Sequence, residues 1–292
     1  METVVEVKNV SKQLRDFSLN NLTFQINKGY ITGFIGPNGA GKTTTIRCLL
    51  NIMNIDHGEI TLFGQTHEKQ TKEIKQRIGF VSDENYYYED LTIEKNKRLI
   101  APFYDNWSDE RFYHYMNIFQ LPRYKAVKHL SKGMKVKFSI AMALAHNPQF
   151  IIMDEPTSGL DPVFRRELLD LLLDIMQNEE KAIFFSTHNT TDLERVADFI
   201  TFIHDGKIVF SDEKDAIFER HVLVKGKKQQ LSEVKKLQLA GFKETEVGFE
   251  ALITNRDEIP HSLMEQLVLE KPKLEDIMYY TARRDSLATA HF

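Results

Sequence analysis

The sequence has little of several features that would assign it to whole classes of protein. Its 292 residues include one cysteine, Cys48, which excludes an internal disulfide and a cysteine-based metal cluster. We expect Cys48 to pack against its neighbours rather than to act in redox chemistry. A basic surplus is also missing, because the net charge is −4 and the pI is about 6.2, so no nucleic-acid partner is expected.

Long apolar runs are absent as well. No stretch of the sequence approaches the ~18–20 apolar residues that are needed to span a bilayer. The first six residues, METVVE, lack the basic and apolar regions of a signal peptide. We therefore expect a soluble, intracellular chain, and a hydrophobic content of 42% is ample for a packed core.

A glycine-rich segment is the most informative feature that is present. Residues 36–43, GPNGAGKT, fit the pattern of Gly, four residues and Gly-Lys-Ser/Thr that binds phosphate. A strand-like run at 31–35 precedes it, and a helix-like run at 44–50 follows it. Glycine lets the backbone pass close to a triphosphate, and the helix adds its positive N-terminal end. This context turns a pattern match into a predicted nucleotide site.

Two side chains of this loop have specific predicted tasks. Lys42 can reach the β- and γ-phosphates, and Thr43 can supply an oxygen to Mg²⁺. The residues that we expect to bind phosphate are Asn38, Gly39, Ala40, Gly41, Lys42, Thr43 and Thr44.

Strand-like and helix-like patterns alternate along most of the chain and predict an α/β fold. We expect a P-loop NTPase (RecA-like) core with a mostly parallel sheet, antiparallel β elements and helices on both faces. The expected strands are 3–8, 22–26, 31–35, 60–63, 78–81, 150–153 and 182–186, with helices at 42–53 and after Asp161-Pro162 and a hairpin around Asp205-Gly206. The core would comprise residues 1–83 and 148–215. A helical subdomain would occupy 84–147, and a small α+β accessory domain would occupy 216–292, with strands at 222–224 and 246–253 and a partly helical 261–283.

Four further motifs follow the phosphate loop in a fixed order. Residues 130–134 (LSKGM) start a helix, 151–155 (IIMDE) end a buried strand, 158–161 (SGLD) come next, and 186–188 (STH) end another strand. Up to about residue 215, this order and spacing resemble the nucleotide-binding subunit of ATP-binding-cassette (ABC) transporters.

The run KGYITGF and the signature variant SKGMK resemble in particular the ATPase subunits of Gram-positive exporters of antibiotics, peptides or lipids, among which a phenol-soluble-modulin exporter ATPase is one candidate. The resemblance implies ATP and Mg²⁺ as cofactors and a second ATPase subunit, in a homodimer or a paralogous heterodimer. It also implies a separate integral-membrane subunit, with this chain at the cytoplasmic face of the cell membrane.

Three residues are expected to act in hydrolysis besides Lys42. A carboxylate at a strand end near the phosphate loop can hold Mg²⁺, and the next carboxylate can polarise the attacking water. The resemblance gives Asp154 the metal and Glu155 the water. A histidine after a strand is more often a surface or capping residue, but the position of His188 matches the family's switch histidine, which contacts the γ-phosphate.

The LSKGM segment predicts a second anion site. A Ser hydroxyl, a Gly amide and a helix N-terminus together attract anions. The resemblance implies that Ser131 and Gly133 bind the ATP of the opposite subunit and that Asp161 crosses the interface. The family usually has Gly where this chain has Lys132, and Gln where it has Met134. Positive charges near a helix N-terminus are unfavourable, so the lysines of this segment indicate an anionic partner.

Two further positions depart from the family pattern and leave alternatives open. Asp83 stands where the family has a Gln that links Mg²⁺ to the transporter contact; it either binds metal through water or caps the next helix. Leu14 lies near the position where an aromatic side chain usually stacks on adenine. Phe17 either replaces that aromatic or belongs to the core.

Aromatic residues around Tyr86-Tyr87-Tyr88 are either ordinary core or the lining of a groove that receives a short helix of the membrane subunit. The segment 271–278 resembles one near the end of many such ATPases and serves dimer contact, regulation or packing. Rival functions are a non-transport ABC ATPase that acts on ribosomes or DNA, a P-loop kinase, which would lack the LSKGM element, and a weakly hydrolysing regulatory subunit.

Overall fold

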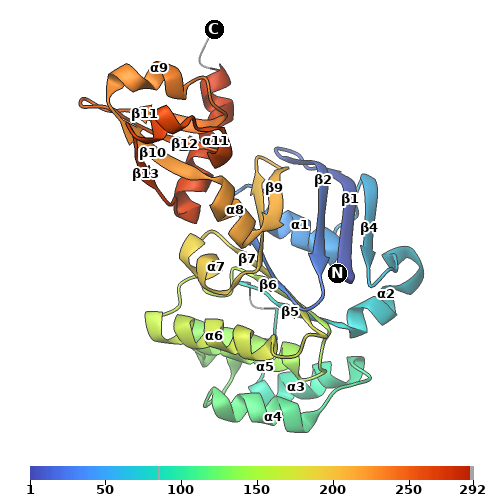
Figure 1. Cartoon of the computed structure of the whole chain (residues 1–292). Helices are drawn as coiled ribbons and strands as arrows, with labels where there is room; N and C mark the ends of the chain where they lie inside the picture. The colour runs from blue at the N-terminus through green and yellow to red at the C-terminus, as the bar shows by residue number, and fades with distance from the viewer. Residues whose placement is uncertain (85, 290–292) are drawn as a thin grey trace. The chain divides into compact units, whose positions relative to one another are not determined.

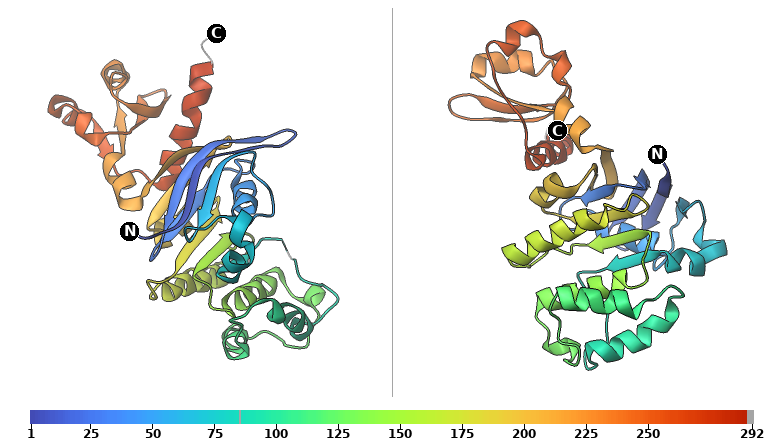
Figure 2. Two further views of the ribbon diagram at one scale, coloured as in Figure 1. Left: turned by 90° about the vertical axis from the view of Figure 1, so that its right-hand side faces the viewer. Right: turned by 60° about the horizontal axis from the view of Figure 1, so that its bottom comes forward.

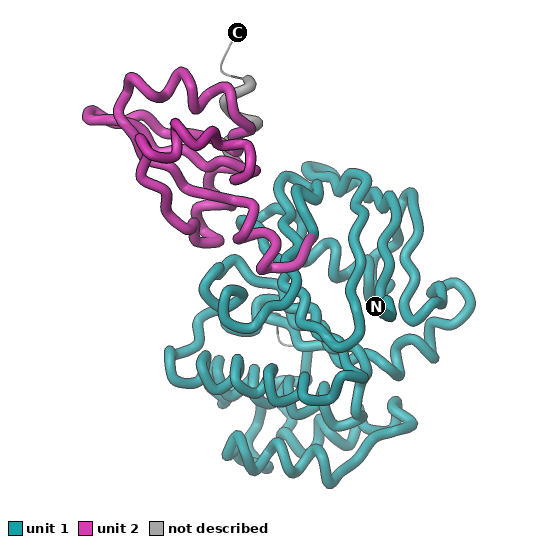
Figure 3. The backbone as a smooth tube through the Cα atoms, viewed as in Figure 1, with its two compact units in different colours: residues 1–211 teal, residues 212–292 magenta. Residues whose placement is uncertain are grey.

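The computed structural model describes residues 1–84 and 86–289, with side chains described up to residue 282. The chain forms two compact units, Met1–Ser211 and Asp212–Phe292 (Figure 3). Within the described residues, no helix combines the length and the apolar character that a membrane crossing requires.

A six-stranded sheet with the order β5-β6-β7-β3-β8-β9 forms the centre of the first unit (Figure 1). Every residue of β3 (Ile31–Ile35), β6 (Phe150–Asp154) and β7 (Ala182–Thr187) is buried. These strands pair in parallel with one another and with β5 (Ile78–Val81) and β8 (Phe199–His204). Mostly apolar strands are typical of a parallel sheet covered on both faces, and the parallel pairing confirms the predicted sheet.

The last strand of this sheet is antiparallel. A tight turn connects β8 to β9 (Lys207–Glu213), and its residues Asp205 and Gly206 both have positive φ angles, of 44° and 70°. Such a pair is typical of two-residue hairpins, which confirms the hairpin predicted at this point.

An antiparallel sheet, β2-β1-β4, packs against the same core. It consists of β1 (Thr3–Gln13), β2 (Ser18–Asn27) and β4 (His57–Leu62). Phe24 of β2 stacks on Phe34 of β3 and on Phe184 of β7, with ring centroids 5.8 and 6.0 Å apart. This contact joins the two sheets, and helix α1 (Lys42–Leu49) contributes Ile46 and Leu49 to the same cluster.

Helix α1 ends four residues before the predicted end at residue 53. Asn51 has a φ of 51°, and the amide of Ile52 donates to the carbonyl of Arg47 over 2.9 Å. Asn tolerates the left-handed conformation that ends helices in this way. Helix α2 (His67–Gln76), which follows β4, has a weak apolar pattern and was not expected from the sequence.

Residues 93–144 form a cluster of helices with its own core (Figures 1 and 2). It contains α3 (Ile93–Ile100), α4 (Asp109–Ile118) and α5 (Lys132–Leu144), with short 3₁₀ turns at Ala101–Phe103 and Val127–His129. The helical pattern was expected from residue 84, but the first helix begins nine residues later. The remaining helices of this unit are α6 (Pro162–Ile175) and α7 (Thr190–Val196).

The second unit contains a four-stranded antiparallel sheet with the order β11-β12-β10-β13. Its strands are β10 (Val222–Gly226), β11 (Leu239–Glu244), β12 (Phe249–Ile253) and β13 (Val268–Glu270). Its helices are α8 (Lys214–Arg220), α9 (Leu231–Val234), α10 (His261–Met264) and α11 (Leu274–Thr289), with 3₁₀ turns at Lys228–Gln230 and Arg256–Glu258. The strand expected at 246–253 begins at Phe249, and β11 was not expected.

Candidate nucleotide-binding site

The glycine-rich loop connects the buried strand β3 to the N-terminus of α1, and two of its glycines have no substitute. A Cβ atom on Gly36 would lie 2.3 Å from the carbonyl oxygen of Ile203. Gly41 has a φ of 110°, and a Cβ there would lie 2.6 Å from Leu19. Only glycine avoids both the clash and the strain, so the loop shape follows directly from its sequence.

Lys42 is buried and curls back over this loop. Its Nζ donates to the carbonyl oxygens of Gly36 and Pro37, over 2.8 and 3.2 Å, and lies 3.3 Å from Oε1 of Glu155. All three acceptors are oxygens that the oxygens of a bound phosphate can replace. The ammonium group is therefore already inside the concave side of the loop.

Asp154 ends β6 next to this ammonium group. The Ser186 hydroxyl donates to its Oδ1 over 2.8 Å, and Thr43 also hydrogen-bonds the carboxyl group. Burial raises the pKa of Asp154 above its usual value, because desolvation outweighs these hydrogen bonds. A nearby cation would stabilise the ionised form of this buried carboxyl group.

The donors around Asp154 fit Mg²⁺. Thr43, Asp83, Asp154 and Glu155 line one hollow of about 180 Å³. Hydroxyl and carboxylate oxygens are the ligands that this ion prefers. Among the described residues, no group of three or more His, Cys, Asp or Glu side chains could hold a metal by itself. Mg²⁺ is commonly held by one or two protein ligands and the substrate phosphates, so such a group is not required.

Glu155 brings the predicted hydrolytic residues together. Its Oε2 lies 2.8 Å from Nδ1 of His188 and accepts the backbone N–H of His188 over 3.3 Å, while its Oε1 faces Lys42. Glu155 has a φ of 50°, a conformation that is uncommon for residues other than glycine. Strained backbone of this kind clusters at functional sites.

The LSKGM residues form a separate surface at the start of α5. The Oγ of Ser131 caps this helix by accepting the N–H of Met134 over 3.2 Å. Asp161 caps α6 in the same way, by accepting the N–H groups of Val163 and Phe164. A Cβ on Gly133 would lie 3.6 Å from Phe164, so the starts of the two helices are neighbours.

Asp83 forms an ion pair rather than a helix cap. Its Oδ1 lies 3.0 Å from Nζ of Lys132. The alternative in which it caps the next helix is wrong, because α3 begins at Ile93 and its N-cap is Thr92. A role of Asp83 in metal binding stays a prediction.

The residues considered for adenine lie beside the phosphate loop. The ring of Phe17 packs against the core, and a Cβ on Gly41 would lie 2.9 Å from its Cζ. Leu14 is half-buried, and its N–H donates to the carbonyl of Phe17 over 2.8 Å. Base stacking by either residue stays a prediction.

The three tyrosines at 86–88 divide between core and surface. Tyr87 packs on Phe138 with ring centroids 4.5 Å apart, whereas Tyr86 and Tyr88 are exposed. Phe103 is exposed too. The core interpretation is therefore right for Tyr87, and two tyrosines remain available for a partner.

Sequence reasoning missed a hydrogen-bonded network around the buried Asp192. Asp192 of α7 accepts the Thr157 hydroxyl over 2.8 Å and Nε of Arg165 of α6 over 2.7 Å. It links the segment after β6 to the helix that follows His188. Thr157 lies between two of the recognised motifs, but no local pattern pointed to Asp192 as its partner.

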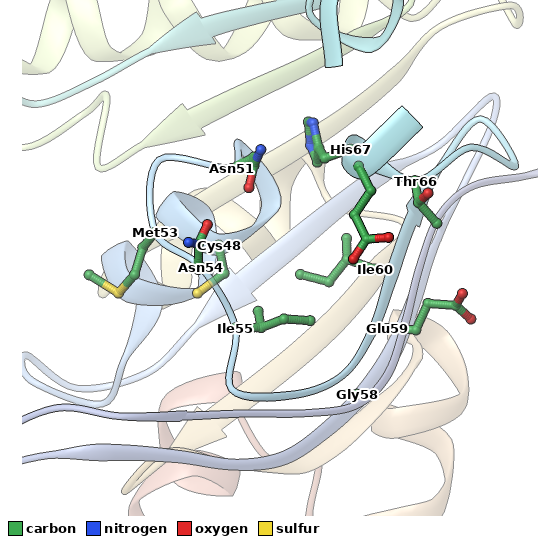
Figure 4. A pocket seen from close by; sticks show the side chains of 11 residues that line it. Cys48, Asn51, Met53, Asn54, Ile55, Gly58, Glu59, Ile60, Thr66 and His67 are labelled. Carbon is green, nitrogen blue, oxygen red and sulfur yellow. The ribbon is translucent and has the colours of Figure 1, made fainter. Parts of the chain in front are cut away.

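A further hollow, of about 550 Å³, lies at the other end of α1 (Figure 4). Its lining includes Cys48, Asn51 and His67. Cys48 is buried, and burial raises the pKa of its thiol to about 11. The thiol is therefore protonated at neutral pH, as expected of a packing residue.

Known proteins are similar to this chain in sequence and in fold. Residues 19–158 match the family model described as "ABC transporter". The chain is 34% identical to the uncharacterized ABC transporter ATP-binding protein YhcH of Bacillus subtilis over 212 residues, 72% of this chain and 70% of the relative. The bacitracin transport ATP-binding protein BcrA of Bacillus licheniformis is also 34% identical, over 72% of this chain and 69% of its own length.

Solved structures agree with these matches. The ATP-binding subunit of an ABC transporter superposes with a TM-score of 0.68 and 29% identity, covering 74% of this chain and 92% of that one. The ATP-binding cassette MJ0796, in a dimeric post-hydrolysis state with ADP and Pi, gives 0.64 and 25%, covering 72% and 98%. On its sequence, its fold and its phosphate loop, this chain belongs to the ATP-binding ATPase subunits of ABC transporters.

Proposed function

We propose that this chain binds Mg-ATP at the loop 36–43, closes on a second ATPase subunit, and hydrolyses ATP to drive the membrane subunit of an exporter. The observation that carries the proposal is the contact of Glu155 with both Lys42 and His188. These three side chains come from three different segments and meet beside the phosphate loop. That is the arrangement needed to position a γ-phosphate and a water molecule.

Each residue has a distinct task in the proposed reaction. Lys42 exchanges the Gly36 and Pro37 carbonyls for phosphate oxygens, and the backbone amides of residues 38–44 bind the remaining phosphate oxygens. Thr43 and Asp154 would hold Mg²⁺, which would offset the charge of the phosphates. Glu155 orients the attacking water and accepts its proton as the water oxygen approaches phosphorus in line with the leaving ADP.

His188 acts on the same water and phosphate. Its contact with Glu155 holds the imidazole ring at the edge of the site, where it can reach the γ-phosphate. The start of α5, with Ser131 and Gly133, would bind the nucleotide held by the opposite subunit, and Asp161 would lie at the seam. The partner is a second copy of this chain or a paralogue.

The exposed tyrosines and the named relatives support an exporter. Tyr86 and Tyr88 are large, exposed aromatic residues of the kind that line a groove for a partner helix. BcrA of Bacillus licheniformis is named for bacitracin transport and SrtF of Streptococcus pyogenes for lantibiotic transport. We therefore place the chain at the cytoplasmic face of the cell membrane, bound to a separate integral-membrane subunit.

The substitution Glu155→Gln tests the catalytic assignment. It keeps the shape of the side chain but removes the base, so turnover should fall by about 10²–10⁴-fold while ATP binding persists. Size-exclusion chromatography with light scattering should then show ATP-dependent pairing of the variant. Glu179→Gln, on an exposed residue, is the matched control and should hydrolyse ATP at the parental rate.

Full turnover of Glu155→Gln would contradict the assignment. Pairing of the variant with itself would identify a homodimer, and pairing only with a second ATPase would identify a paralogous partner. Co-purification of the parental chain with ribosomes, and never with a membrane protein, would instead favour a non-transport ATPase.

A further inference from the structure

Two residues that depart from the family pattern meet in the folded chain. The resemblance places an uncharged residue at both positions, Gln at 83 and Gly at 132, whereas this chain has Asp83 and Lys132. Asp83 Oδ1 and Lys132 Nζ lie 3.0 Å apart. Two exceptional charges of opposite sign therefore neutralise each other within one subunit.

The Lys132 side chain lies beside Gly159 of the segment 158–161. A Cβ on Gly159 would lie 3.3 Å from Nζ of Lys132 and 3.5 Å from its Cδ, and Gly159 has a φ of 67°. The lysine side chain therefore lies along a loop that belongs to the proposed dimer seam. Its ammonium group is held near that seam but turned towards a carboxylate of its own subunit.

Asp83 lines two separate hollows. One, of about 180 Å³, is the candidate metal pocket with Thr43 and Asp154. The other, of about 380 Å³, is lined by Lys132 and further residues of α5. The next residue, Glu84, lies 3.5 Å from Arg47 of α1. Residues 83 and 84 thus tie the phosphate-loop helix to the start of α5 through ion pairs.

We propose that the Asp83–Lys132 pair is an ionic latch that the partner's nucleotide opens. The inference rests on the proposed function and commits to a second copy of this chain as the partner. In the unpaired chain the latch occupies the ammonium group of Lys132. When two copies close, the phosphates of the ATP bound by the opposite copy take Lys132 from Asp83.

The exposure of the pair suits this exchange. The side chains of Lys132 and Asp83 are 48% and 44% exposed, and ion pairs of this kind are weak because water competes for both partners. A triphosphate carries more negative charge than one carboxylate, so it outcompetes Asp83 for the lysine. The released Asp83 can then turn to the pocket with Thr43 and Asp154. ATP at one site of the dimer would thereby affect the metal pocket of the other site. By linkage, metal binding at that pocket would affect the affinity of the first site for ATP to the same extent.

A double-mutant cycle in the Glu155→Gln background tests the latch. The quantity measured is the ATP concentration at which half of the chains have paired, at fixed protein concentration and low salt. Asp83→Asn frees Lys132 and should lower this concentration by about two- to fivefold. Lys132→Gln removes the contact with the partner's phosphates and should raise it by about tenfold or more. Asp83→Asn added to Lys132→Gln should change nothing, because no latch is left to open.

Lys128 and Asp90 provide the matched control. They form an exposed ion pair, 2.7 Å apart, in the same region of the chain. Asp90→Asn and Lys128→Gln make the same charge changes and should shift the half-pairing concentration by less than about 1.5-fold. If the control replacements shifted the half-pairing concentration as much as the replacements of Asp83 and Lys132, the change in net charge would explain both results. The latch would then be refuted.

Two other results would also overturn the latch. In the first, Asp83→Asn raises the half-pairing concentration, as expected if the carboxylate serves only the metal. In the second, Asp83→Asn has the same effect on this concentration with and without Lys132. In either case the parent chain still pairs and the proposed function stands. If the parent binds ATP, measured separately by fluorescence titration, but never pairs with itself, the homodimer and the latch both fail.

Discussion

Helices α6 and α7 are linked by two ion pairs that differ mainly in burial. Arg165 and Asp192 are 2.7 Å apart, and Asp170 and Arg195 are 2.6 Å apart. The Asp192 side chain is 2% exposed, whereas the Asp170 side chain is 52% exposed. Replacing each aspartate by alanine therefore compares a buried with an exposed pair between the same two helices.

The expected magnitudes follow from this difference. Breaking a buried ion pair by removing one partner costs about 3–5 kcal/mol. Because the Arg165 side chain is 30% exposed and water can reach it, we expect about 2–3 kcal/mol for Asp192→Ala. For a unit the size of Met1–Ser211, each kcal/mol lowers Tm by about 2–4 °C, so the drop should be about 4–12 °C. Asp170→Ala should cost at most about 1 kcal/mol.

Differential scanning calorimetry of the full chain without nucleotide measures both shifts. Asp192→Asn should fall between Asp192→Ala and the parent, because its amide oxygen can still accept from Thr157 and Arg165. The ATPase rate should fall as well, since α7 begins two residues after His188. Equal Tm shifts for Asp192→Ala and Asp170→Ala would refute the reasoning, because burial would then make no difference.

Two more predictions follow from the site. Burial raises the pKa of Asp154 in the folded chain above the usual value of 3.8. The folded chain therefore binds a proton at Asp154 more tightly than the unfolded chain does. As a consequence, the free energy of unfolding falls as the pH rises from 3.8 through the raised pKa. Asp154→Asn should therefore abolish hydrolysis yet raise the nucleotide-free Tm at pH 7, with the gain vanishing towards pH 4; a lower Tm at pH 7 would contradict this. Replacement of the exposed Tyr88 by Asp should leave basal ATPase activity unchanged and reduce co-purification with the membrane subunit, whereas replacement of the exposed Ile118 by Asp, the control, should leave co-purification unchanged.

The predictable parts of this protein are those in which local sequence decides the structure. The phosphate loop needs glycine where a Cβ would strike Ile203 or Leu19, and these glycines are visible in the sequence. Buried parallel strands appear as short apolar runs, such as FIIM in β6 and AIFF in β7. Lys42 and Glu155 follow β3 and β6, which lie on either side of β7 in the parallel sheet, so the meeting of the two residues could be expected from their motifs.

Other features depended on partners that are distant in the chain. The end of α1 needed knowledge of the φ of Asn51, because the apolar pattern continues beyond that residue. The three residues at 86–88 are all tyrosines, and only the packing of Tyr87 against Phe138 distinguishes it from its two neighbours. Asp192 resembles any polar residue of a surface helix until Thr157 and Arg165 are placed beside it.

Asp83 and Lys132 are two departures from the family pattern that are explained only when they are considered together. Considered alone, Asp83 is a poor replacement for a neutral metal-linking Gln, and Lys132 puts a positive charge at a helix N-terminus where it is unfavourable. Considered as a pair 3.0 Å apart, each charge offsets the cost of the other. The two positions are therefore coupled, and Asp83→Asn should lower the ATP concentration for half-pairing only in a chain that still has Lys132 to release. Departures from a family pattern are thus best assessed together, after the fold has shown which of them touch.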